Sequence, residues 1–416
     1  FKIIPLFLSE GRNLARQQMV LPSAALSLAR IKVTKMINFS KNSTSKALFV
    51  LTSAGVFASS QALAGVSLES DGGWSTDIYG SVPVFVVYTD NDDAEKGFRV
   101  QSGFNPANIN FSVSAPEMES GITVSGHFQI DTHLQGSGVQ NNGLFESRIA
   151  NIKVSGDFGT LTFGKDFGVF NSSAIGDLSS QRGVGWLGGG ADTANTTGGR
   201  IGTGYVYANF NPQVKFTSKD YNGLSFKIAM INPEEPQDAS VETDSPRLEA
   251  QVNYSMPIES GALSVWSGLF QQAVSVTGEN AFDYDMQGYD IGANIELAGF
   301  GLTLNYTDTT GIGADGLYGG TIEDADVDAT QWYVETYYTF GKYTVGASYG
   351  EGSQDAREAD AESGLAAVGE VDNELSMLFV NYQMSPQFRL IGELQDYSST
   401  VQDDYSAIVV GFQYDF

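Results

Sequence analysis

Apolar and polar residues alternate along most of the chain after residue 65, which is the pattern of β-strands with one apolar and one polar face. In Arg247–Met256, every second residue from Leu248 onward is apolar and the residues between are polar. The final run, Ala407–Phe416, alternates in the same way. Similar alternation marks further runs: Ala107–Ser114, Ile122–His133, Tyr284–Leu297, Leu302–Thr307, Gln331–Phe340, Tyr343–Tyr349, Leu375–Met384 and Phe388–Gln395.

The connections between these runs alternate in length. Short links rich in Gly, Asn and Pro, such as Gly156–Gly159 and Tyr221–Gly223, have tight-turn chemistry. Longer polar stretches lie between them, including Phe167–Asn211 and Glu351–Val371. Counting runs predicts about sixteen strands, and short turns on one side with long loops on the other indicate an all-β, transmembrane antiparallel β-barrel. The two-residue period does not say which face of a strand points inward. A soluble β-sandwich or solenoid is therefore the alternative fold.

A leader segment precedes the patterned region. Lys41 and Lys46 form a basic stretch, residues 47–57 are mainly apolar, and Ala62-Leu63-Ala64 has the pattern of a signal-peptidase site. A transmembrane helix is the alternative, but the apolar run is short and interrupted by hydroxyl side chains. We expect residues 36–64 to be a signal peptide and residues 65–416 to form the barrel. We interpret residues 1–35 as upstream sequence from a wrong start choice.

The charge balance is strongly acidic. The whole chain has 22 Lys and Arg against 49 Asp and Glu, and removing residues 1–64 leaves 14 against 48, a net charge near −34. Such a charge disfavours nucleic acid and anionic substrates, and it attracts cations. The aromatic content and the regular alternation argue against the disorder that is common in acidic chains.

Three segments resemble parts of Gram-negative outer-membrane general diffusion porins. Ser147–Lys165 resembles their Arg-led strand, Gly-Asp-Phe-Gly turn and following strand, and Trp186–Asp192 is similar to the tip of their third loop. The last strand, which ends on Phe416, resembles their closing strand. The resemblance implies an integral protein of the Gram-negative outer membrane, a homotrimer, and a third loop that folds into the barrel and narrows it.

In that family the narrowing sets acidic loop residues against basic wall residues. The resemblance assigns Asp177 and Asp192 to the loop, and Arg148 and Lys165 to the wall. Alternation does not decide which face Arg148 is on. Counting back from Ile152 and Val154 places it outward, and counting from Ile149 places it inward. An Arg that faces lipid near the bilayer midplane costs roughly 2–4 kcal/mol, so we expect Arg148 to face inward. Arg182 and Arg200 are further candidates for the narrowing.

Alternation also places other charged residues on the polar side of the strands. The acidic ones are Asp131, Glu249, Asp290, Glu296, Glu335 and Glu393, and the basic ones are Lys215, Lys227, Arg247 and Arg389. Each alone has a plain alternative as a solvated wall residue without a role in selectivity. Together the excess of carboxylates predicts a negative lumen.

The sequence offers little for other chemistry. The two histidines, His127 and His133, lie six residues apart on one predicted strand, roughly 20 Å, which is too far for one metal ion. Asp324–Asp328 has alternate carboxylates but lacks the Gly and the distal Glu of a Ca²⁺ loop. We expect no enzyme activity, catalytic residue, metal site or cofactor.

These observations predict an outer-membrane porin, a water-filled, cation-preferring channel for passive diffusion of small hydrophilic solutes. Its expected partners are outer-membrane lipid and lipopolysaccharide, copies of itself in a homotrimer, small solutes and cations, and not nucleic acid. The alternative is a non-conducting barrel that serves as an adhesin or structural anchor through its acidic loops.

Overall fold

The computed structural model describes residues 65–91, 97–134, 145–188, 196–236, 239–242, 244–278, 281–318, 320–361 and 363–416. The expected signal peptide (residues 36–64), the residues before it and the loop candidate Asp192 lie outside these ranges. The chain divides into units of residues 1–50 and 51–416, and all described residues belong to the second.

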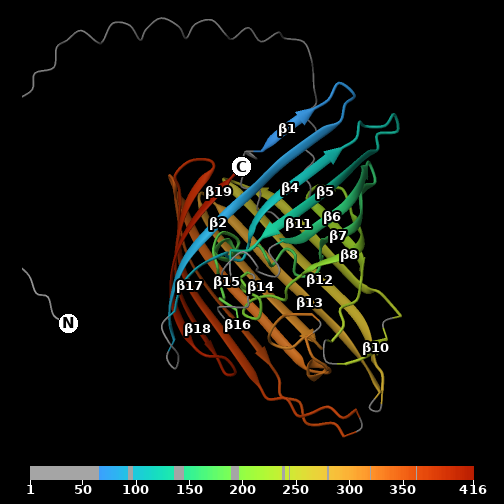
Figure 1. Ribbon diagram of the computed structural model, residues 1–416, viewed down its shortest axis with the longest axis vertical. Helices are drawn as coiled ribbons and strands as arrows, with labels where there is room; N and C mark the ends of the chain where they lie inside the picture. The colour runs from blue at the N-terminus through green and yellow to red at the C-terminus, as the bar shows by residue number, and fades with distance from the viewer. Residues whose placement is uncertain are drawn as a thin grey trace, which may run out of the picture. The chain divides into compact units, whose positions relative to one another are not determined.

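Sixteen antiparallel strands form a closed barrel, as the sequence predicted (Figure 1). The final strand pairs with the first long one, from Tyr405 opposite Asn91 to Asp415 opposite Ser81, which leaves no open edge. The sixteen strands are β2 (Ser75–Asn91), β4 (Ala107–Ser114), β5 (Thr123–Thr132), β6 (Phe145–Gly156), β7 (Gly159–Phe167), β8 (Phe210–Thr217), β9 (Leu224–Ile231), β11 (Arg247–Ile258), β12 (Gly261–Val276), β13 (Phe282–Leu297), β14 (Phe300–Thr310), β15 (Asp328–Phe340), β16 (Tyr343–Gln354), β17 (Val371–Gln383), β18 (Phe388–Ser399) and β19 (Tyr405–Asp415).

Short elements supplement the barrel. The short strands are β1 (Val66–Glu69), β3 (Gly97–Gln101) and β10 (Val241–Glu242), and the helical turns are α1 (Leu178–Arg182) and η1 (Ile322–Asp324). Among the described residues, no helix is long and apolar enough to cross a membrane. We call the side of the barrel with the short turns the turn end and the opposite side the loop end.

The apolar face of the strands points out of the barrel and the polar face points in. On β11, Val252 is 50% exposed whereas its neighbour Gln251 is 1% exposed. On β18, Leu394 is 52% exposed whereas Glu393 is 3% exposed. A soluble sandwich would bury the apolar series instead, so the soluble alternative is wrong. An apolar outer face around a polar inner face is the arrangement of a transmembrane barrel.

Aromatic side chains mark the two ends of the apolar outer band. At the turn end, Phe340 stacks on Tyr343, which lies 4.8 Å from Tyr382 between ring centroids. At the loop end, Trp332 and Tyr349 have ring centroids 5.6 Å apart. Aromatic rings with one polar edge suit the two membrane interfaces, so these rows set the height of the lipid-facing band.

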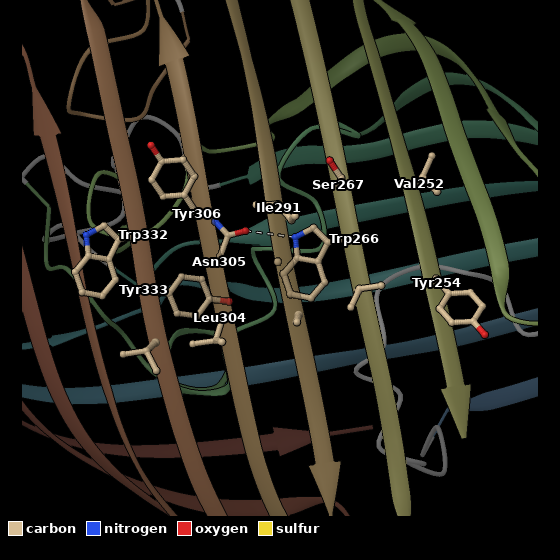
Figure 2. Close-up of a pocket in the computed structure, with 14 residues that line it drawn as sticks. Val252, Tyr254, Trp266, Ser267, Ile291, Leu304, Asn305, Tyr306, Trp332 and Tyr333 are labelled. Carbon is tan, nitrogen blue, oxygen red and sulfur yellow. Dashed lines mark hydrogen bonds between the residues drawn. The ribbon is translucent and has the colours of Figure 1, made fainter. Parts of the chain in front are cut away.

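A hollow of about 680 Å³ interrupts the outer face over β11–β15 (Figure 2). Small side chains at Ser267 and Ala293 leave room between the larger Val265, Ile291 and Leu304. Its lining is almost entirely apolar, as expected for a surface in contact with acyl chains. The hollow lies outside the barrel and is separate from the lumen.

The inner face is apolar in one region, which the sequence did not predict. Phe270 and Met286, on the inward faces of β12 and β13, lie in a cluster of buried apolar side chains. Phe170 and Val206, from the connection between β7 and β8, pack there with Ile312, from the connection between β14 and β15. Long connections therefore fold into the barrel and cover part of its wall.

Candidate functional site: the third loop and the barrel wall

The third long connection, residues 168–209, is bonded to the inner wall, and we call it loop 3. Glu249 on β11 accepts hydrogen bonds from the backbone N–H groups of Val169 and Phe170 at 2.6 and 2.9 Å. Asp290 on β13 accepts from the backbone N–H of Asn171 at 3.0 Å and from its side-chain amide at 2.8 Å. The start of loop 3 is thereby fixed to two wall carboxylates.

The same arrangement continues around the barrel. Glu335 on β15 accepts from the backbone N–H groups of Leu178 and Ser179 at 2.6 and 3.0 Å. The two carboxylate oxygens of Glu393 on β18 lie 3.3 and 3.4 Å from the backbone nitrogen of Val184. Loop 3 therefore follows the wall from β11 to β18, one carboxylate after another.

We call these four residues the anchoring carboxylates: Glu249, Asp290, Glu335 and Glu393. The sequence predicted all four as lumen-lining residues, and the structure does place them on the inner face. Each is nonetheless at most 3% exposed, because loop 3 lies over it. A loop inside a barrel has backbone N–H groups that need acceptors, and these carboxylates supply them. Their interactions are with the loop rather than with open solvent.

The helical turn α1 in loop 3 is held by its own cap. The Asp177 carboxylate accepts from the backbone N–H of Ser180 at 3.0 Å, which is an N-cap, and from the hydroxyl of Tyr205 at 3.0 Å. Burial and the nearby Asp177 charge raise the pKa of Tyr205, so the phenol keeps its proton and donates. Asp177 was predicted to face Arg148 or Lys165; its carboxylate instead bonds within loop 3, at a helix start that the sequence analysis did not identify.

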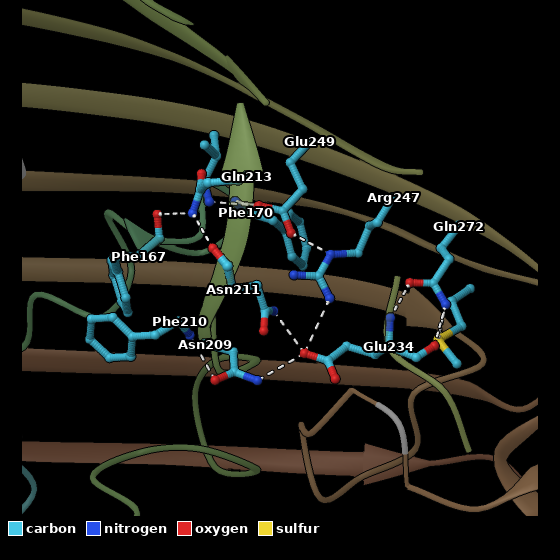
Figure 3. Close-up of polar contacts among 12 residues, drawn as sticks. Phe167, Phe170, Asn209, Phe210, Asn211, Gln213, Glu234, Arg247, Glu249 and Gln272 are labelled. Carbon is cyan, nitrogen blue, oxygen red and sulfur yellow. Dashed lines mark hydrogen bonds and ion pairs between the residues drawn. The ribbon is translucent and has the colours of Figure 1, made fainter. Parts of the chain in front are cut away.

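The two ends of loop 3 meet a buried ion pair (Figure 3). The Arg247 guanidinium, which is fully buried, lies 3.0 Å from Glu249 and 4.1 Å from the ring centroid of Tyr318. Glu234 accepts from the side-chain amides of Asn209 and Asn211 at 2.9 and 2.7 Å, and it lies 3.9 Å from Arg247. Arg247 thus contacts two connections directly, at Glu234 and Tyr318, and its partner Glu249 bonds loop 3. The sequence indicated only that Arg247 faces inward.

A β-bulge settles the orientation of Arg148. The pairing of β5 with β6 shifts between Gln129 and Ile130, and the shift leaves Arg148 without a cross-strand partner. Its side chain points inward, is 7% exposed and lies 2.8 Å from Asp131. It also contacts Glu146 at 3.3 Å. Simple alternation fails across the bulge, which is why it gave two answers for this residue.

The structure does not bring Lys165 to the inner wall. Lys165 pairs across strands with Ala150 and Pro212, in the series that also contains the exposed, outward Phe163. Its neighbour Asp166 is on the inner face and forms a 2.9 Å ion pair with Lys215. Lys165 was predicted to line the narrowing because of its place in the family motif, and side-chain alternation puts it on the other face.

Two other predicted lining residues lie toward the turn end. Glu296 is exposed and accepts a hydrogen bond from the hydroxyl of Tyr337 at 2.9 Å. Arg389 is 2% exposed; it donates to Gln413 at 3.1 Å and lies 3.8 Å from Asp415.

The inner wall of β6, β8 and β9 carries three lysines. Thr162 on β7 pairs with Lys153 on one side and Lys215 on the other, so both lysines share one inward row. Lys227 on β9 donates to the Ser172 hydroxyl at 3.3 Å. Within the described chain, no hydrogen bond joins residues 168–188 to β4, β5 or β6. The part of the wall without such bonds carries charges of both signs, since Arg148 lies there beside Asp131 and Glu146.

A polar cavity of about 270 Å³ lies between α1 and the wall. Gln181 and Arg182 line it from loop 3, and Asn108, Asn110 and Gln413 line it from β4 and β19. Burial, with a contribution from the charge of Arg389, lowers the pKa of Arg182 to about 10, so its guanidinium remains a cation at neutral pH. The described residues contain no group of three or more acidic or histidine side chains that could hold a metal ion.

A closed barrel with an apolar exterior and a loop bonded along its inner wall defines the class of outer-membrane channel proteins. The chain belongs to the Gram-negative porin family, whose model matches residues 47–403. It is an integral protein of the Gram-negative outer membrane. No curated protein matches it by sequence.

Solved porin structures share the fold at low sequence identity. The outer-membrane channel DcaP of Acinetobacter baumannii has 16% identity and a TM-score of 0.60, covering 84% of this chain and 100% of DcaP. The anion-selective porin of Comamonas acidovorans has 17% identity and a TM-score of 0.59, covering 82% and 100%. Salmonella typhi OmpF, in complex with daunomycin, has 14% identity and a TM-score of 0.56, covering 84% and 100%.

Proposed function

We propose that the barrel is a water-filled channel through which small hydrophilic solutes cross the outer membrane by passive diffusion. The observation that supports this most is the one-sided attachment of loop 3. Its bonds to Glu249, Asp290, Glu335 and Glu393 hold it against β11–β18, whereas its described residues 168–188 make no hydrogen bond to β4, β5 or β6. Pore radius and wall charge then set permeation, with no catalytic step.

Conductance of the purified protein in planar bilayers tests this proposal. We expect discrete steps that scale with bulk conductivity, as in a wide aqueous pore. A barrel that inserts but passes no current would overturn the proposal and favour the adhesin or anchor alternative.

We further propose that the channel prefers cations and that the preference originates at its loop end. Exposed carboxylates gather in the connection between β16 and β17, at Asp355, Glu358 and Glu370. Such a mouth concentrates cations. The anchoring carboxylates contribute less to this preference than the sequence suggested, since loop 3 covers them.

One solved structure with this fold is described as an anion-selective porin, so the fold does not determine the sign of the ion selectivity. A zero-current potential that indicates anion preference in dilute KCl would refute this proposal.

We also propose a homotrimer in a membrane that contains lipopolysaccharide, and a mature chain that begins at Gly65. A solved structure of Vibrio cholerae OmpT, 15% identical with a TM-score of 0.52, is described as a trimer form. Native mass spectrometry of the detergent-extracted protein tests the trimer, and a monomer mass would contradict it. Amino-terminal sequencing of protein isolated from the membrane tests the cleavage site.

A further inference from the structure

The polar cavity of about 270 Å³ between α1 and the wall has one charge of each sign in its lining. Of the described residues that line it, only Arg182 and Asp415 are charged. The Asp415 carboxylate is already engaged, because its Oδ1 accepts from Gln413 at 2.8 Å and its buried Oδ2 lies 3.8 Å from Arg389. A charged solute must leave water to enter, and the opposite charges of the lining partly cancel each other. A neutral solute avoids this cost, so the cavity favours neutral molecules.

Side-chain amides line much of the cavity and hold one another in place. Asn110 donates to the side-chain carbonyl of Asn108 at 2.9 Å. Asn105 donates to the backbone carbonyl of Gln181 in α1 at 3.0 Å and to its side-chain carbonyl at 3.2 Å. These bonds orient the amides before a solute arrives, so binding does not have to order them.

The same network leaves both a donor and an acceptor for a solute. The Ser81 hydroxyl accepts from Gln413 at 3.1 Å, and within the described chain its own proton is not donated. The side-chain carbonyl of Asn105 accepts no hydrogen bond from any described residue, since the bonds of this amide use its NH₂ group. A sugar hydroxyl is a donor and an acceptor at once, so a cavity with both kinds of group matches a molecule that has several hydroxyls.

The rest of the lining includes apolar surface from Pro83, Pro386 and Phe416. The ring of Phe416 lies against Gly80, where a Cβ atom would be 2.7 Å from ring atom Cζ. A small sugar presents C–H groups as well as hydroxyls, and an apolar ring beside hydrogen-bonding amides complements both.

We propose that this cavity is a binding subsite for small, neutral, polyhydroxylated solutes of the size of a monosaccharide. The subsite rests on the proposed channel function, because solutes reach it only through an open lumen. It lies on the turn-end side of α1, and it acts on neutral solutes, which a charged mouth neither attracts nor repels. Weak binding with fast release makes the passage of such a solute saturable, which simple diffusion is not.

The test is uptake of radiolabelled glucose into proteoliposomes that contain the purified protein. We expect an initial rate that saturates with glucose concentration. In the double variant Ser81→Ala, Asn105→Leu the half-saturating concentration should be at least about fivefold higher, as for loss of two neutral hydrogen bonds. The matched control is Ser264→Ala, Asn294→Leu, which changes a hydroxyl and an amide that pair across β12 and β13 outside the cavity lining. The control should match the wild type, and all variants should keep the conductance in KCl that shows an intact pore.

Each result has a distinct meaning. Absence of any conductance would defeat the channel proposal, and the subsite with it. Normal conductance with glucose uptake that rises linearly at all concentrations, or saturation that Ser81→Ala, Asn105→Leu leaves unchanged, would overturn the subsite alone. Triethylene glycol, which has hydroxyls only at its ends, should compete with glucose weakly, and equal competition would show that the cavity does not recognise hydroxyls. If gluconate or glucosamine competes better than glucose, the site selects charge and the assignment to neutral solutes is wrong.

Discussion

At the scale of single residues, a side chain can lie on the inner face of the barrel and still be shielded from the pore. Side-chain alternation correctly placed Glu249 and Glu335 on the inner face, and it could not show that loop 3 covers them. The groups that cover these carboxylates are backbone N–H groups of loop 3, and every residue except proline has one, so the sequence does not reveal them. Arg148 shows a second limit, because one bulged residue changes the parity of everything before it.

Asp177 provides a test at this scale. Replacing Asp177 with Ala removes the N-cap of α1 and leaves the buried Tyr205 hydroxyl without its acceptor. We expect a local loss of about 1–3 kcal/mol. Hydrogen–deuterium exchange of the amides in Leu178–Arg182 should become faster. Asp220→Ala, which removes a carboxylate that accepts from Gly223 in a short turn, is the matched control and should leave α1 unchanged. Equal exchange in the two variants would contradict the capping role.

At the scale of elements, the structure extends the strands beyond their predicted ends, mostly on the side of the loops. Predicted Tyr343–Tyr349 continues to Gln354 in β16, and predicted Leu302–Thr307 continues to Thr310 in β14. Beyond the lipid-facing band, outward positions such as Asp308 and Glu351 no longer need apolar side chains. The period-two signal therefore fades although backbone pairing continues. Ala107–Ser114 keeps its predicted bounds as β4.

The attachment of loop 3 gives a prediction about an element. In the double variant Glu335→Gln, Glu393→Gln, each carboxylate oxygen replaced by an NH₂ group loses its acceptor role, toward Leu178 or Ser179 at Glu335 and toward Gln395 or Val184 at Glu393. We expect loop 3 to loosen, which should appear as larger fluctuations of the open-channel current and faster protease cleavage within residues 168–188. The zero-current potential should change little. Glu296→Gln, at an exposed position, is the control. A quiet channel with a shifted potential would instead show that the two carboxylates act on permeating ions.

The junction at Arg247 gives a second prediction at this scale. Arg247→Met removes the counter-charge of the buried Glu249 and the cation over the Tyr318 ring. Leaving one charge of a buried pair uncompensated typically costs 3–5 kcal/mol, so the midpoint of heat unfolding in detergent should fall. The double variant with Glu249→Gln should recover part of the loss, because no buried charge remains. If the double variant were as unstable as the sum of the two single ones, the residues would not act as a pair.

At the scale of the whole molecule, the sequence was sufficient for the barrel and insufficient for the lumen. Closure follows from local alternation repeated sixteen times, and each strand supplies its own evidence. The interior depends on contacts distant in sequence, such as Val184 with Glu393 and Leu187 with Tyr405. It also contains the buried apolar cluster around Phe270, in which strand residues pack against residues of long connections distant in sequence.

The distribution of charge gives the last prediction, which belongs to the whole molecule. Because loop 3 covers the anchoring carboxylates, we propose that the exposed residues of the loop end are the main source of the proposed cation preference. A variant with Asp355→Asn, Glu358→Gln, Glu370→Gln and Asp372→Asn should shift the zero-current potential toward zero in dilute KCl. The difference from the wild type should shrink as salt rises, because the screening length falls from about 10 Å at 0.1 M to ~3 Å at 1 M.

Lys153→Gln, on the inner wall, should shift the zero-current potential in the opposite direction. It should lose less of its effect in high salt, since a group inside a narrow lumen is screened less. If the four changes at the loop end leave the potential unaltered while Lys153→Gln alters it, the sign of selectivity is set by the wall.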